Sequence, residues 1–162
     1  RYYCNISIDI FMKSIEGNFK NTEVNTLLEK HFKELRSVSP EGSAHVLDIP
    51  GLQTDSIKFW SLWENEMLVG CGALKFLEKD HGEFKSIRVV DGFRKKGYGV
   101  KILQHLIDEA KKLNITMLSL ETGSGDFFLP ARTLFKKVGF KECPPFAHYK
   151  KDPNSCYMNL KI

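Results

Sequence analysis

A change of hydrophobic period in the middle of the chain constrains the fold more than any other sequence feature. Three runs rich in aromatic and β-branched residues are typical of strands: 57–64, 67–77 and 83–90. Only two short turns separate them: Asn65-Glu66 and Asp80-His81-Gly82. From Gly97 to about Asn114 the apolar residues instead recur at helical spacing. We therefore expect an antiparallel meander that leads into a long helix.

The flanking segments complete a mixed pattern. Asn21 or Thr22 caps a predicted helix that runs to Val38, and Gly139 ends a second helix over 128–138. The other expected segments are a first strand, a connector, a buried strand, two final strands and the loop between them: 6–12, 39–56, 115–120, 140–143, 156–162 and 144–155. The order β-α-β-β-β-α-β-α-β-β predicts an α+β fold with a mixed, mostly antiparallel central sheet flanked by helices. We expect the two helices after Val90 to join neighbouring strands as crossovers.

Composition narrows the class of protein. A length of 162 residues predicts one domain spanning 1–162. A net charge of +4 argues against a dedicated nucleic-acid binder, and no apolar run is long enough to cross a membrane. Polar residues interrupt the opening stretch, so we expect no signal peptide. The four cysteines form no CxxC pair and predict reduced thiols in the cytoplasm.

The segment 87–100 carries the clearest chemical signal. A strand ends, a basic loop with Gly97 and Gly99 follows, and a long helix begins. Glycines let the loop amides approach a ligand at the positive end of that helix, which suits a pyrophosphate. The spacing is neither a Walker A loop nor a full GxGxxG, so a capped helix with a solvated basic start is the alternative.

The pattern V-x-x-x-x-R-x-x-G-x-G, from Val89 to Gly99, resembles a motif of the GNAT (acyl-CoA N-acyltransferase) superfamily. Segment 134–140 (LFKKVGF) is similar to a second GNAT signature, and further segments resemble a bacterial subgroup of small, cytoplasmic acetyltransferases. The resemblance implies a GNAT-like fold in which the fourth and fifth strands part around the arm of acetyl-CoA, the co-substrate. It implies that the arm and the thioester of acetyl-CoA pair with the backbone of three residues: Ile87, Arg88 and Val89. It implies that the pyrophosphate is held by Arg94, Lys95, Lys96, Gly97, Tyr98, Gly99 and Val100.

Acyl transfer to an amine requires that the amine lose a proton and that the leaving thiolate be stabilised. Glu83 is the first candidate for the base, because it lies six residues before Val89 and shares its strand face by the two-residue period. Some GNAT members carry a glutamate base there. Glu121, at the end of the next strand, is the second candidate. A strand-edge glutamate in water is the alternative reading of Glu83.

The thiolate acid is absent from its usual position. Many GNAT enzymes place a tyrosine where this chain has Phe135, which cannot donate a proton and which also fits an apolar helix stripe. Tyr149 in the long loop, or Tyr98, is the candidate substitute. We expect the acceptor site to be built by the 144–155 loop and three aromatic residues: Phe59, Trp60 and Trp63. The alternative is that the aromatic residues on one face of the strand belong to the core. The scattered histidines show no metal spacing, so no metal is expected.

These observations predict an acetyl-CoA-dependent N-acetyltransferase that acts on a primary amine by direct attack. The first alternative is a non-catalytic GNAT-fold module that binds acyl-CoA, and the second is a binder of another phosphate ligand. The acceptor is a small molecule or a peptide amine, with small amine, amino acid, polyamine and peptide N-terminus all left open. C-terminal strands of GNAT proteins often pair, so the resemblance also leaves a homodimer open.

Overall fold

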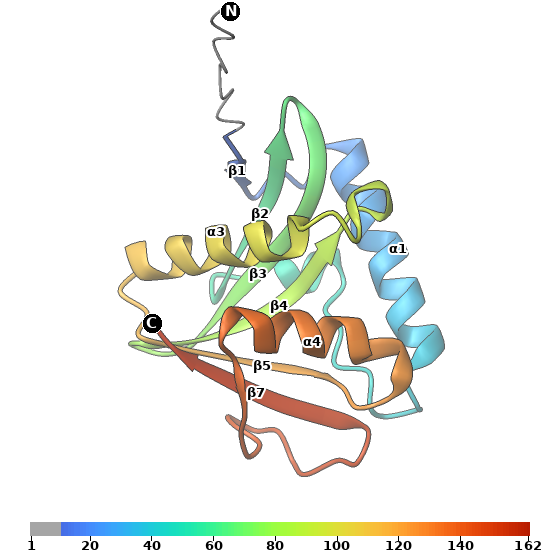
Figure 1. Cartoon of the computed structure of the whole chain (residues 1–162), viewed down its shortest axis with the longest axis vertical. Helices are drawn as coiled ribbons and strands as arrows, with labels where there is room; N and C mark the ends of the chain where they lie inside the picture. Colours follow the sequence, from blue (N-terminus) through green and yellow to red (C-terminus); the bar gives the residue numbers. More distant parts are fainter. Residues whose placement is uncertain (1–10) are drawn as a thin grey trace, which may run out of the picture.

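The computed structural model describes residues 11–162 (Figure 1). Most of the predicted first strand lies outside that range, and the first described strand begins at Lys13. The helices and strands are, in chain order, β1 (Lys13–Glu16), α1 (Thr22–Val38), α2 (Ile49–Leu52), β2 (Ile57–Glu64), β3 (Met67–Glu78), β4 (His81–Val89), the 3-10 turn η1 (Asp91–Phe93), α3 (Tyr98–Lys112), β5 (Met117–Gly123), the 3-10 turn η2 (Asp126–Phe128), α4 (Leu129–Val138), β6 (Lys141–Glu142) and β7 (Ser155–Lys161).

The expected helix limits are confirmed by their caps. The Asn21 side chain accepts a hydrogen bond from the Val24 amide at 3.1 Å, which opens α1. Gly139 ends α4 in the left-handed region at φ +117°. The short helix α2 was not expected, although Asp48 caps it and Pro50 lies in its first turn, as the sequence pattern would allow.

In residues 11–162, seven strands form one sheet in the order β1-β2-β3-β4-β5-β7-β6. Among these described strands only β4 and β5 run parallel, and α3 connects them as the predicted crossover. We also expected α4 to connect two neighbouring strands. That prediction is wrong, because β7 lies between β5 and β6, the strands before and after α4. The long 144–155 loop gives the chain enough length to return into that position. The α+β fold with a mostly antiparallel sheet is confirmed.

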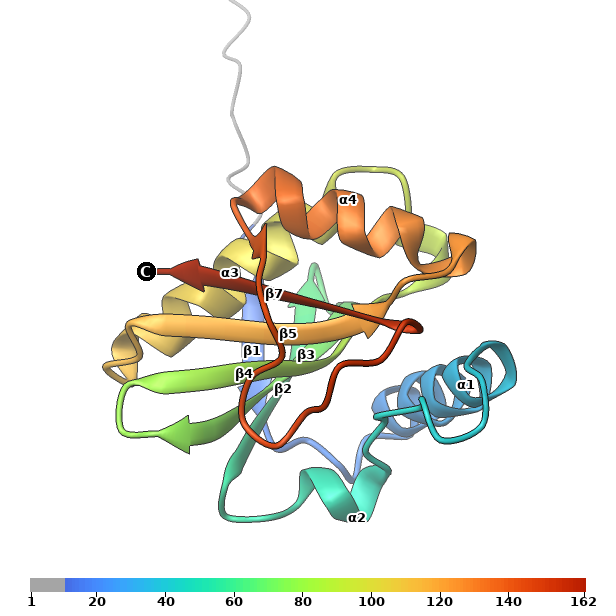
Figure 2. The same cartoon turned by 90° about the horizontal axis from the view of Figure 1, so that it is seen from below.

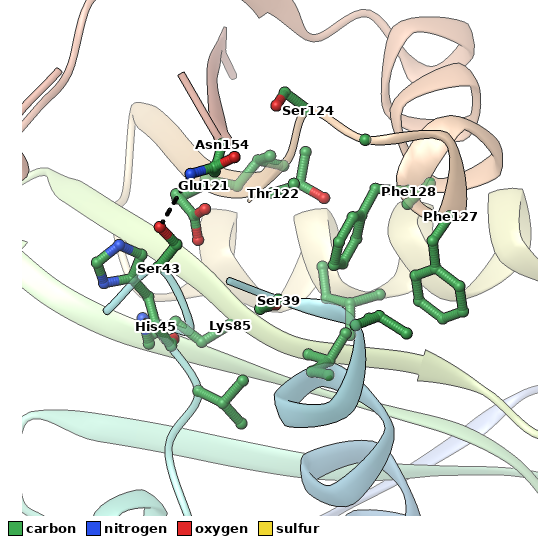
Figure 3. Close-up of a pocket in the computed structure, with 18 of the residues that line it drawn as sticks. Ser39, Ser43, His45, Lys85, Glu121, Thr122, Ser124, Phe127, Phe128 and Asn154 are labelled. Atoms are coloured by element: carbon green, nitrogen blue, oxygen red, sulfur yellow. Dashed lines mark hydrogen bonds between the residues drawn. The ribbon is translucent and has the colours of Figure 1, made fainter. Parts of the chain in front are cut away.

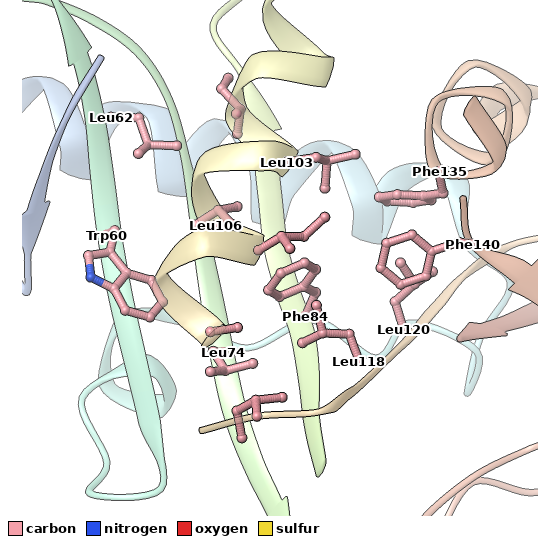
Figure 4. Packing of buried hydrophobic residues seen from close by; sticks show 14 of the residues in the cluster. Trp60, Leu62, Leu74, Phe84, Leu103, Leu106, Leu118, Leu120, Phe135 and Phe140 are labelled. Atoms are coloured by element: carbon pink, nitrogen blue, oxygen red, sulfur yellow. The ribbon is translucent and has the colours of Figure 1, made fainter. Parts of the chain in front are cut away.

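Helices cover both faces of the sheet, with α3 and α4 on one side and α1 and α2 on the other (Figure 2). Each face has its own buried cluster. Figure 4 shows the α3 and α4 side, where the rings of Phe84 and Phe135 pack around Phe140. Phe59 and Trp60 point to opposite clusters and are 2% and 4% exposed, so they are core residues and the prediction that they build an acceptor site is wrong.

Candidate active site

The two parallel strands part after a short paired stretch. The register between β4 and β5 runs from His81 opposite Met117 to Glu83 opposite Ser119. Beyond it, β4 continues along β3 to Val89, whereas β5 continues along β7. The strands diverge in both cartoons (Figures 1 and 2). The parting expected from the family resemblance is thus confirmed, and the facing edge of β4 is left without a strand partner in the described part of the chain.

A cavity of about 370 Å³ occupies this parting (Figure 3). Its walls come from residues 84–87 of β4 and residues 120–126 at the end of β5. The last turn of α1, the following connector and the start of α4 close the other sides. Segments far apart in the sequence therefore meet around one small space where the sheet is open.

A bulge in β4 changes which side chains face this space. Ser86 has a positive φ of +53°, and the pairing with β3 shifts register around it. As a result Glu83, Lys85 and Arg88 lie on the α1 face of the sheet, whereas Val89 packs against the α3 cluster. The expectation that Glu83 shares a face with Val89 is wrong, because strict two-residue alternation does not survive the bulge.

The structure nevertheless brings the two proposed catalytic residues together. The Tyr149 hydroxyl donates to Glu83 Oε2 at 2.5 Å, and Lys85 Nζ lies 3.4 Å from the same oxygen and 3.1 Å from the Tyr149 oxygen. Glu83 is only 1% exposed. Burial and the Glu83 charge raise the pKa of Tyr149, so its hydroxyl keeps its proton. Lys85 lines the cavity, whereas Glu83 and Tyr149 are not among the lining residues.

Glu121, the second candidate for the base, does line the cavity. It is half-buried, and Figure 3 shows its carboxyl beside Ser43 and Asn154. Burial raises the pKa of this carboxyl; the nearby His45 and Lys85 oppose the rise. A cavity carboxyl with a raised pKa is suited to accept a proton near neutral pH.

Sequence reasoning missed His31, which reaches the cavity from α1. It is 6% exposed, and its Nδ1 has no hydrogen-bond partner in the described structure. Burial and the Arg88 charge lower the pKa of His31 to about 4, so the imidazole is neutral at physiological pH. In the sequence, His31 is marked only by its place on the apolar stripe of α1. That place does not distinguish a core residue from a residue that lines a cavity.

Phe135 both lines the cavity and belongs to the buried cluster under α4, at 7% exposure. Its ring centroid is 5.9 Å from that of Phe140 in an edge-to-face arrangement. Phe135 is therefore a core residue, as its place on the apolar helix stripe predicts, and it also borders the cavity.

The basic loop opens α3 as expected. Gly97 caps the helix with φ +80°, and no side chain caps it, so the first helical N–H groups are open to a ligand. Lys95 and Lys96 are exposed, and Arg94 pairs with Asp91 at 3.2 Å. The Tyr98 hydroxyl is committed elsewhere, since it donates to Glu64 at 2.7 Å.

Two residues of the predicted cofactor set use their side-chain space for packing. A Cβ on Gly99 would lie 2.7 Å from Leu134 Cδ2, so this glycine permits the close approach of α3 and α4. The Arg88 guanidinium is 6% exposed and pairs with Glu34 of α1 at 2.8 Å. At these two positions only the backbone is available to a ligand.

Residues 11–162 contain no group of three or more His, Cys, Asp or Glu side chains placed to hold a metal ion. Across the same residues no helix is both long and apolar enough to cross a membrane. Cys71, Cys143 and Cys156 are free thiols, and Cys4 lies outside the described residues.

Comparison with known proteins gives the family. The model of the acetyltransferase (GNAT) family matches residues 23–140. The chain belongs to the GNAT acetyltransferase family. This GNAT chain is 45% identical over 140 residues to the uncharacterised N-acetyltransferase YsnE of Bacillus subtilis, covering 86% of this chain and 93% of the relative. It is 39% identical over 139 residues to the uncharacterised N-acetyltransferase YedL of Escherichia coli, covering 86% and 87%.

Solved structures agree with the GNAT fold. An acetyltransferase of Streptococcus agalactiae superposes with a TM-score of 0.71 at 19% identity, covering 93% of this chain and 98% of the other. The N-acetyltransferase PseH of Campylobacter jejuni, solved in complex with acetyl coenzyme A, gives a TM-score of 0.65 at 19% identity, covering 93% and 99%. The family resemblance read from the sequence is confirmed.

Proposed function

We propose that this GNAT protein transfers the acetyl group of acetyl-CoA to a primary amine by direct attack of the amine on the thioester. The observation that carries the proposal is the cavity at the parting of β4 and β5, because it joins an unpaired strand edge to a half-buried carboxyl. The N-acetyltransferase names of the two relatives and the acetyl-CoA complex of PseH support the reaction class.

The residues of this chain fit the cofactor in two places. The open edge of β4 offers backbone N–H and C=O groups to an extended amide-containing arm, as a missing strand would. The exposed N-terminus of α3 offers N–H groups and positive charge to a pyrophosphate. We assign the arm to the backbone of Ile87, Arg88 and Val89, and the pyrophosphate to Arg94, Lys95, Lys96, Gly97, Tyr98, Gly99 and Val100.

We assign proton removal to Glu121 in preference to Glu83. Glu121 faces the cavity, whereas Glu83 is fully buried and already bonded to Tyr149 and Lys85. In this assignment the acceptor ammonium gives one proton to the Glu121 carboxylate. The amine lone pair then forms the C–N bond, and the C–S bond breaks with its electron pair on the coenzyme A sulfur. The new amide nitrogen loses its second proton, and the thiolate gains one, which leaves a neutral amide and the coenzyme A thiol. Glu83 is a positioning residue that holds Lys85 against the cavity.

Tyr149 does not line the cavity and its hydroxyl donates to Glu83, so we propose that it serves the departing thiolate through Lys85, which lines the cavity and donates to the Tyr149 oxygen. The raised pKa of Tyr149 makes it a weak acid, and a thiolate is a stable leaving group. We therefore expect Tyr149→Phe to lower kcat less than Glu121→Gln does.

Steady-state turnover of acetyl-CoA with a panel of primary amines tests this proposal. Glu121→Gln should lower kcat by about 100-fold or more while coenzyme A affinity stays unchanged. The loss should shrink at high pH, where the amine is already neutral. A larger loss of kcat in Glu83→Gln than in Glu121→Gln would instead identify Glu83 as the base.

A non-catalytic GNAT module is the second candidate function, because Phe135 stands where many relatives carry a tyrosine. Tight binding of acetyl-CoA without transfer to any amine of the panel would favour it. Tighter binding of ATP than of coenzyme A would instead point to another phosphate ligand.

A further inference from the structure

The cavity has two chemically different ends. Figure 3 shows the polar end, where Glu121, His45 and Lys85 gather with Ser43 and Asn154. The opposite end is apolar and is formed by the η2 rings and the last turn of α1: Phe127, Phe128, Leu35 and Val38. An acceptor that lies beside the acetyl-CoA arm in this space meets polar side chains at one end and apolar side chains at the other.

The polar end carries more negative than positive charge. Lys85 is the sole lysine or arginine among the described residues that line the cavity, and its ammonium already pairs with the buried Glu83. His31, on the wall, is neutral because its pKa is about 4. The Glu121 carboxyl therefore has Ser155, His45 and a shared Lys85 as its stabilising neighbours, and the Glu83 charge opposes them. A carboxylate in a partly desolvated site is stabilised by a cation, and an ammonium ion supplies one.

Two of the large apolar side chains at the apolar end are exposed to solvent. Phe127 is 46% exposed and Val38 is 37% exposed, although both belong to the cavity wall. The Phe127 ring lies edge-to-face with Phe128, whose ring in turn packs directly over Gly123. These contacts fix the orientation of the pair and leave one apolar surface free for a ligand.

We propose that the acceptor is a small primary monoamine with an aromatic or branched apolar substituent, its amino group at Glu121 and its substituent on Phe127 and Val38. The inference rests on the proposed function and names its substrate class. The cavity of about 370 Å³ lies at the lower end of the roughly 300–1,000 Å³ typical of small-molecule pockets, and the acetyl end of the co-substrate takes part of it, so the remaining space favours a compact acceptor over a peptide.

The same charges disfavour two other acceptor classes. The carboxylate of an amino acid would face Glu121 with no unpaired lysine to receive it. The second ammonium of a diamine would enter the apolar end and lose hydration there. Asp126 lies at that end but is exposed to water, which makes a diamine the sharpest competitor to test.

The experiment compares kcat/KM for four acceptors with acetyl-CoA: 2-phenylethylamine, phenylalanine, putrescine and a short peptide with a free N-terminus. Phenylalanine differs from 2-phenylethylamine by one carboxylate, and putrescine carries a second ammonium in place of the ring. We expect 2-phenylethylamine to exceed each of the others by about tenfold or more. A higher value for phenylalanine, putrescine or the peptide would overturn the inference and leave the proposed function standing.

A matched pair of variants locates the apolar contact. Phe127→Ala should lower kcat/KM for 2-phenylethylamine by about tenfold and should thereby reduce the preference for 2-phenylethylamine over putrescine. Leu129→Ala is the control, because Leu129 is 54% exposed on the same turn but does not line the cavity. Equal losses in the two variants would refute the Phe127 contact. Absence of transfer to every acceptor would refute the proposed function, and the inference with it.

Discussion

The buried His31 should make the stability of this protein fall steeply between pH 6.5 and pH 4. Its pKa is 6.5 in a model peptide and about 4 in the fold, because burial and Arg88 penalise the charged imidazole. In that interval the unfolded chain binds a proton that the folded chain does not, so the free energy of unfolding decreases as the pH decreases. One pKa unit is worth about 1.4 kcal/mol, so the loss reaches about 2.5 kcal/mol at pH 4.5 and approaches about 3.5 kcal/mol well below pH 4.

Urea unfolding followed by circular dichroism at pH 7.5 and pH 4.5 measures this loss. Carboxylates also titrate in the range, so the informative quantity is the difference between the native protein and His31→Gln. The variant should lose about 2.5 kcal/mol less than the native protein between the two pH values. His148→Gln, at an exposed histidine, is the control and should behave as the native protein does. Equal losses in the native protein and His31→Gln would refute the reasoning.

Three further outcomes follow from the structure. Gly99→Val should lower stability by about 1–3 kcal/mol in thermal unfolding, because the new side chain meets Leu134, whereas the Cβ of Gly97→Val meets open space and strains only the backbone. Phe135→Tyr should change kcat little in steady-state kinetics, because we propose that Tyr149 and Lys85 serve the leaving thiolate; activity that appears only in this variant would favour the binding module. Glu121→Gln should raise the melting temperature at pH 8, because burial raises the pKa of Glu121 and disfavours its charged form in the fold. The gain in melting temperature should vanish below pH 4.5, and differential scanning calorimetry measures it.

Local signals in the sequence predict most of the fold. The Asn21 cap, the Gly139 stop and the turn at Asn65 depend on neighbouring residues only, and each is where the sequence places it. The parallel pair β4 and β5 also follows, because a helix of this length must cross the sheet between them. The family motif then adds what periodicity alone does not contain, namely the parting of these strands.

The rest depends on contacts between distant segments. A single bulge at Ser86 moves Glu83 away from the face of Val89, and no local pattern marks it, since Ser86 is an ordinary strand residue in sequence. The position of β7 between β5 and β6 is decided by a return loop whose path has no period. Likewise His31 becomes a cavity residue only because the end of α1 meets the open edge of the sheet.

Direct product analysis tests whether this chain transfers acetyl from acetyl-CoA to an amine without a covalent intermediate, as we propose. The protein is incubated with acetyl-CoA and 2-phenylethylamine, and mass spectrometry counts free coenzyme A, acetylated amine and acetylated protein. We expect equal amounts of coenzyme A and acetylated amine, and no acetyl group on the protein when the amine is omitted. Acetyl-CoA that binds but yields no acetylated product with any primary amine, or an acetyl-protein that passes its acetyl group to the amine, would contradict the proposal.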